Sequence, residues 1–102
     1  MAKIRKYTLA WGNPTDPDLT TIRVRCSTTP FKGDSTDYNI TYDEVGKVAQ
    51  VDLPLAHTPL IDGNLSIGVS TVDDVGNESD ISSITFPFDL IAPASVTNLR
   101  IL

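Results

Sequence analysis

The sequence predicts an all-β protein, a single antiparallel β-sandwich. Apolar and polar residues alternate with a period of two in several short segments, and turn-forming residues separate these segments. No segment repeats apolar residues at the helical spacing over three turns, and the seven prolines fall where they would break helices. At 102 residues the chain fits one domain, and its 40% hydrophobic residues are spread over the whole length.

Six segments show the alternation of half-buried strands. Their apolar residues are Tyr7, Leu9 and Trp11; Ile22, Val24 and Cys26; Ala49, Val51 and Leu53; Leu65, Ile67 and Val69; Ile84, Phe86 and Phe88; and Val96, Leu99 and Ile101. The three-residue step from Val96 to Leu99 predicts a β-bulge. The polar segment 34–47 is expected to form one edge strand with loops. The predicted core consists of Leu9, Trp11, Val24, Leu65, Ile67, Val69 and Phe86.

Three segments resemble strands of bacterial fibronectin type III domains. Residues 7–16, with Trp11 before a proline-containing loop, resemble strand B. Residues 22–30 resemble strand C, and residues 62–79 resemble strand F with the F–G turn. The resemblance covers about residues 6 to 88 and implies a sandwich of the fibronectin type III or immunoglobulin-like class. Leu65 stands where many members carry a tyrosine, which leaves the hydrogen bond of that tyrosine in doubt.

A segment that resembles strand A follows the other strands instead of preceding them. Members of the family begin with strand A, but here only residues 1–5 precede the first strand, too few for a strand and its turn. Residues 92–101, Ala-Pro-Ala-Ser-Val-Thr-Asn-Leu-Arg-Ile, resemble the usual opening of such a domain. We therefore expect residues 1–91 to form a sandwich that starts at strand B, and residues 92–102 to form a separate strand-A-like segment.

The displaced segment leads to a hypothesis of self-assembly. Residues 89–95 reach at most about 23–25 Å when extended, so a return into the same sandwich would be taut. Tandem domains of the family lie end to end, so the segment reaches the next copy without strain. We expect Val96, Leu99 and Ile101 to complete a neighbouring copy, which makes a head-to-tail homo-oligomer. Because such a contact need not close, it builds a filament.

Other interpretations of the segment stay open at this stage. The tail could complete its own domain, or the chain could be a piece of a tandem array cut between strands A and B. Coordinates with residues 96–101 along Tyr7–Trp11 of the same chain, or lying free, are expected to rule out donation and leave a generic β-module. The alternative function is a ligand-binding, adhesion or spacer module of a cell-surface or carbohydrate-active protein. We expect an extracellular or cell-surface location, although the N-terminus shows no signal-peptide pattern.

Charge and chemistry exclude several function classes. The net charge of −5 argues against nucleic acids and anionic membranes as partners, and no apolar run is long enough to cross a bilayer. The single histidine, His57, has no predicted catalytic neighbour, and the single cysteine, Cys26, is expected on the apolar side of its strand. We predict no catalytic residues and no enzyme activity.

Acidic residues cluster in two loops that share one end of such a sandwich. Asp16 and Asp18 lie in one loop, and Asp73 and Asp74, followed by Asn77 and Glu78, lie in the other. Their oxygen atoms are of the kind that Ca²⁺ binds. Asp and Asn are also common in turns for conformational reasons, and no EF-hand spacing is present. We therefore predict no metal and no cofactor, with calcium at these aspartates as the weaker alternative.

Overall fold

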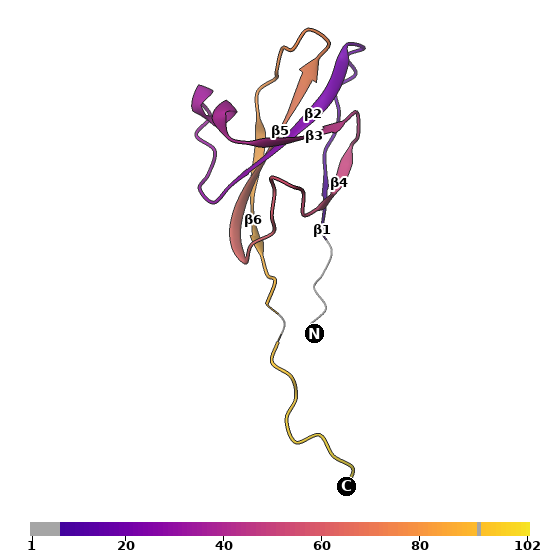
Figure 1. Cartoon of the computed structure of the whole chain (residues 1–102), viewed down its shortest axis with the longest axis vertical. Helices are drawn as coiled ribbons and strands as arrows, with labels where there is room; N and C mark the ends of the chain where they lie inside the picture. Colours follow the sequence, from indigo (N-terminus) through magenta and orange to yellow (C-terminus); the bar gives the residue numbers. More distant parts are fainter. Residues whose placement is uncertain (1–6, 92) are drawn as a thin grey trace.

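The chain folds into two antiparallel β-sheets (Figure 1). The computed structural model describes residues 7–91 and 93–102. The first sheet has the order β3-β2-β5-β6, formed by β3 (Tyr42–Gly46), β2 (Leu19–Ser27), β5 (Gly63–Asp73) and β6 (Ser82–Phe88). The second sheet pairs β1 (Tyr7–Ala10) with β4 (Gln50–Leu53). The predicted all-β architecture with two antiparallel sheets is confirmed.

The core lies between the two sheets. Its buried residues are Leu9, Ile22, Val24, Leu53, Leu65, Ile67 and Phe88. Each residue of this kind stabilises the fold by about 1.5–3 kcal/mol when it leaves water. Four predicted core residues are buried as expected: Leu9, Val24, Leu65 and Ile67. Trp11 and Val69 are partly buried and pack against the others.

Segment 34–47 forms more structure than predicted. The expected edge strand is β3, which pairs only with β2. Before it, the short 3₁₀ helix η1 (Ser35–Asn39) begins after Asp34, whose carboxylate accepts a hydrogen bond from the Thr36 backbone N–H. The buried Asp37 carboxylate accepts hydrogen bonds from the Lys32 and Gly33 backbone N–H groups, at 3.0 and 2.8 Å. Polar side chains therefore fold this segment locally, which apolar periodicity does not reveal.

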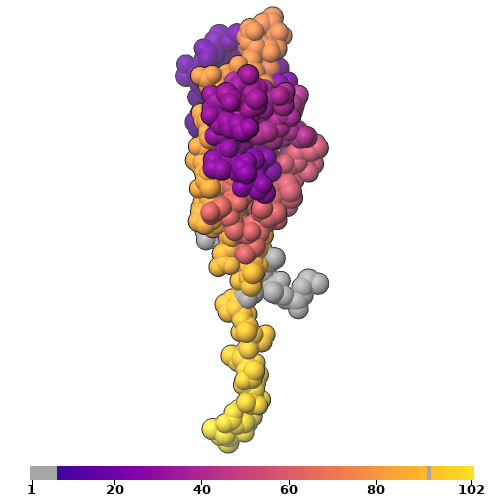
Figure 2. All heavy atoms as spheres, turned by 90° about the vertical axis from the view of Figure 1, so that its left-hand side faces the viewer, coloured from indigo at the N-terminus to yellow at the C-terminus, as the bar shows by residue number. Residues whose placement is uncertain are grey.

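The C-terminal tail, residues 93–102, continues from β6 along the long axis and leaves the sandwich (Figures 1 and 2). The strand predicted around Val96, Leu99 and Ile101 does not form within the chain, because the tail has no partner strand there. Among the described residues, no helix is long and apolar enough to cross a bilayer. The prediction that residues 1–5 form no strand concerns a segment outside the described residues.

Candidate functional site

An apolar groove runs between β1 of one sheet and β6 of the other. The groove contains a hollow of about 130 Å³. It is lined by Leu9, Ala10, Trp11, Ile67, Val69, Ser82, Ser83 and Ile84. A second hollow continues it toward Asp16 and Asp80 and shares Trp11, Val69 and Ser82 with it. The groove therefore runs from the second half of β1, at Leu9, past Trp11 to the end of the molecule where the acidic loops lie.

One edge of β1 has no partner strand among the residues that the structure describes. The backbone N–H of Trp11 donates to the Ala49 carbonyl at 3.0 Å, so Trp11 directs its main chain toward the segment that leads into β4. Main-chain groups of successive residues in a strand point to alternate sides. Thr8 and Ala10 therefore direct their N–H and C=O groups to the open edge. Such an edge can pair with an added strand.

The inner face of β6 exposes large apolar side chains beside this edge. Ile84 is 55% exposed and Phe86 is 40% exposed, whereas Phe88 is buried. The prediction that Phe86 belongs to the core is therefore wrong. The reason is that β6 is an edge strand of the four-stranded sheet, and the opposing sheet, with two strands, is too narrow to cover it. Phe86 instead contacts Tyr7, with ring centroids 5.9 Å apart.

The C-terminal tail exposes the three residues predicted to join copies. Val96 is 80% exposed, Leu99 89% and Ile101 98%. The backbone bends at Asn98, which has a left-handed φ of 55°, and the Arg100 guanidinium donates to the Asn98 carbonyl at 2.9 Å. The alternative in which the tail lies along β1 of its own chain does not occur in this structure. A free tail in a single chain does not exclude donation, contrary to our expectation, because a lone chain offers its tail no neighbouring groove.

The acidic candidate residues gather at the end of the sandwich where the 12–18 and 73–80 loops meet, as predicted. Carboxylate oxygens of Asp18, Asp73 and Asp74 lie within 4.8 Å of one another. Asp16 lines the same hollow as Asp18 and Asp73. The Asp73 carboxylate, however, already accepts hydrogen bonds from the Val75 and Asn77 backbones and from the Asn77 side chain. These bonds, the one from the Asn77 side chain foremost, lower the pKa of Asp73. The carboxylate oxygens of Asp73 therefore already stabilise the turn through these hydrogen bonds.

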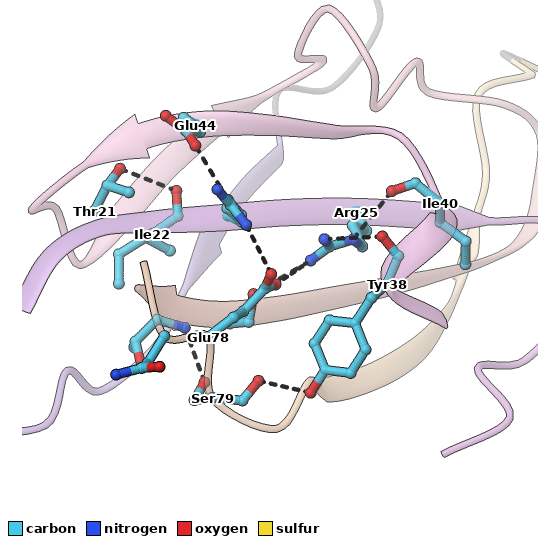
Figure 3. A network of polar contacts seen from close by, with 12 residues as sticks. Thr21, Ile22, Arg25, Tyr38, Ile40, Glu44, Glu78 and Ser79 are labelled. Carbon is cyan, nitrogen blue, oxygen red and sulfur yellow. Dashed lines mark hydrogen bonds and ion pairs between the residues drawn. The ribbon is translucent and has the colours of Figure 1, made fainter. Parts of the chain in front are cut away.

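A buried polar network covers the outer face of the four-stranded sheet (Figure 3). Arg25, 1% exposed, donates to Glu78 at 2.5 Å and to the backbone carbonyls of Ile40 and Tyr38 at 3.0 and 3.4 Å. Glu78 also accepts from Arg23 at 2.8 Å. Burial acts to raise the pKa of Glu78, but hydrogen bonds from Arg25, Ser70 and Arg23 outweigh it, so the pKa is lowered.

Sequence reasoning missed this network because it considered only the apolar side of β2. The alternation of Arg23 and Arg25 with apolar residues does place both arginines on the outer face. That face is covered by η1 and by the loop that carries Glu78, neither of which belongs to a strand. The signal that could have revealed it is the pair of arginines on a central strand, since buried charges require partners.

The residues considered for catalysis form no catalytic arrangement among the described residues. His57 is exposed, and its backbone N–H, rather than its ring, contacts a carboxylate, that of Asp43 at 2.8 Å. Cys26 is partly buried in the core, and burial raises the pKa of its thiol, which disfavours the reactive thiolate.

Comparison with protein-family models, with curated proteins and with solved structures finds no match to this chain.

Proposed function

We propose that this protein is a structural module that assembles head to tail with copies of itself, by adding its C-terminal tail as a strand to the groove of a neighbour. The observation that carries the proposal is the pairing of two complementary features in one chain. One is an apolar groove beside an open strand edge, and the other is a free tail with exposed apolar residues. Exposed apolar residues and an unpaired strand edge are both unfavourable in water. The tail can add the missing strand to the edge, and the groove can bury the apolar residues of the tail.

The arrangement of the sheets supports a sandwich of the fibronectin type III kind as the framework. In immunoglobulin-like sandwiches, strands A, B and E share one sheet. If β1 corresponds to strand B and β4 to strand E, the two-stranded sheet lacks strand A next to β1. The segment that resembles strand A is the free tail. The open edge of β1 is thus the place where strand A is missing, and the displaced segment is the strand that would fit there.

The expected free energies indicate that assembly needs both apolar contacts and main-chain hydrogen bonds. Burial of a Val, Leu or Ile side chain contributes about 1.5–3 kcal/mol, so the three tail residues together contribute roughly 5–9 kcal/mol. Association itself costs about 4–15 kcal/mol. Apolar contacts alone therefore leave little net affinity, and main-chain hydrogen bonds to the open edge of β1 are needed as well. We expect oligomers that lengthen as the protein concentration rises.

The test is assembly of the full chain against a double variant, Leu99→Asp with Ile101→Asp. Loss of two buried apolar residues removes about 3–6 kcal/mol, which is at least a hundredfold in affinity. Size-exclusion chromatography and negative-stain microscopy of concentrated protein should show filaments for the full chain and monomers for the variant. A matched control, Ser95→Asp with Thr97→Asp, adds the same charge at non-apolar tail positions and should still assemble. A full chain that stays monomeric at high concentration would falsify the proposal.

A further inference from the structure

β1 and β6 offer three successive apolar levels, two of them in the groove and the third beyond it at the start of β1. At the first level, Trp11 lies in the same hollow as Val69 and Ser82. At the second, Leu9 shares the hollow with Ile67 and Ile84, which are paired across β5 and β6. At the third, Tyr7 contacts Phe86. The tail likewise carries three exposed apolar residues, Val96, Leu99 and Ile101.

The path of the tail sets its direction in a neighbour. β6 ends at Phe88, whose ring lies 4.8 Å from that of Tyr7, so the tail leaves the sandwich at the Tyr7 end of β1. From there it continues along the long axis of the molecule (Figure 1). A tail that keeps this direction enters the next copy at its Trp11 end and runs toward Tyr7. It is then antiparallel to β1.

The inward-facing position of Leu9 on β1 restricts the register to three choices. Leu9 faces the core, and Thr8 and Ala10 face outward with their main-chain groups at the open edge. Residues directly opposite one another in an antiparallel pair point to the same face. The residue opposite Leu9 must therefore be an inward-facing apolar residue of the tail. Val96, Leu99 and Ile101 all satisfy this condition.

Only one of the three registers fills all three levels. With Leu99 opposite Leu9, Ile101 lies opposite Tyr7, and one extra residue before Leu99 brings Val96 to Trp11. That extra residue is the bulge that the Val96–Leu99 spacing predicts. With Ile101 opposite Leu9 instead, Val96 passes beyond Trp11 and the level at Tyr7 and Phe86 stays uncovered. With Val96 opposite Leu9, Leu99 lies opposite Tyr7 and the level at Trp11 stays uncovered.

Building on the proposed strand donation, we infer that the donated strand runs antiparallel to β1 of the neighbour, with Leu99 opposite Leu9 and Arg100 opposite Thr8. Thr97 and Asn98 form a bulge opposite Ala10. In this register Arg100 points outward, on the face where the Thr8 hydroxyl donates to Asp52 at 2.9 Å. The groove thus selects a strand whose apolar residues are spaced as in the tail, with three residues from Val96 to Leu99 and two from Leu99 to Ile101.

Disulfide trapping between two different variants tests the register. Both variants carry Cys26→Ser, which removes the native thiol. One then carries Arg100→Cys in the tail, and the other carries Thr8→Cys or Ala10→Cys on β1. Opposite residues place their Cα atoms about 5.5 Å apart, within disulfide range, whereas positions displaced by two residues are about 7–8 Å apart. The mixture of Arg100→Cys and Thr8→Cys should cross-link into heterodimers at least about fivefold faster than the mixture with Ala10→Cys.

Each outcome has a defined meaning. Faster trapping of Arg100→Cys by Thr8→Cys supports the register. Faster trapping by Ala10→Cys moves the register by two residues and overturns the inference, while strand donation stands. Filaments without trapping in either mixture overturn the antiparallel placement. Monomers throughout overturn the proposed function itself, which microscopy of the Cys26→Ser chain detects before any oxidation.

Discussion

On the outer face of the four-stranded sheet an arginine is buried, whereas on the inner face an isoleucine is exposed. Arg25 of β2 lies under η1 and the loop that carries Glu78, and each of its three guanidinium nitrogens donates a hydrogen bond there. Ile84 of β6 faces the space between the sheets, yet more than half of its surface is open. Burial in this molecule therefore follows from what covers each strand, and the polarity of the residue does not determine it.

A second comparison, between two isoleucines of the inner face, shows why Ile84 is exposed. Ile67 and Ile84 are the same residue type, lie directly opposite each other on β5 and β6, and point to the same face. Ile67 is 2% exposed and Ile84 is 55% exposed. β5 is central in its sheet, but β6 is at the edge, where the two-stranded sheet does not reach. The difference shows that the inner face of β6 lacks a covering strand.

The largest expected effect concerns the covered outer face. Arg25→Met removes one partner of a buried ion pair and leaves Glu78 and two backbone carbonyls poorly satisfied. We expect a loss of about 3–5 kcal/mol in the free energy of unfolding, measured by urea denaturation. Arg23→Met is the control, since Arg23 is more exposed and should cost about 1 kcal/mol. Equal losses in the two variants would contradict the view that coverage of this face matters.

The paired isoleucines give the next largest effect. Ile67→Ala creates a cavity and should cost about 2–5 kcal/mol in urea denaturation of the monomer. Ile84→Ala removes mostly exposed surface and should cost less than about 1 kcal/mol. Under strand donation, Ile84→Ala should instead weaken assembly, seen as shorter filaments at a fixed protein concentration. Comparable losses of monomer stability would show that β6 is covered after all.

The smallest expected effect is on the pH dependence of stability. Because hydrogen bonds from the arginines and Ser70 lower the pKa of Glu78, its contribution is complete above the ordinary glutamate value of about 4.3. The contribution is lost as the pH falls through the lowered pKa. Urea denaturation between pH 6 and about pH 3 should show a steeper loss in the natural chain than in Glu78→Gln. Parallel profiles would mean that the carboxylate does not contribute to the covered face.

Five of the six segments with alternating apolar residues form strands, but the sequence did not reveal which strand faces would be covered. Leu9, Val24, Leu65 and Ile67 are buried as predicted, because alternation along a strand is a local property. Phe86 has the same alternation and is exposed, because its burial depends on a strand in the other sheet. The burial of Arg25 likewise depends on η1 and on Glu78, 53 residues away along the chain.

The candidate site divides in the same way. The sequence by itself determined the apolar spacing of the tail and the position of the acidic loops at one end of the sandwich. Only the tertiary structure decided that a groove is left open along β1 and that the tail lies outside it. The physical reason is that side-chain spacing is fixed by the geometry of one strand. The presence of a groove, by contrast, is fixed by the relative widths of two sheets, and their strands come from distant parts of the chain.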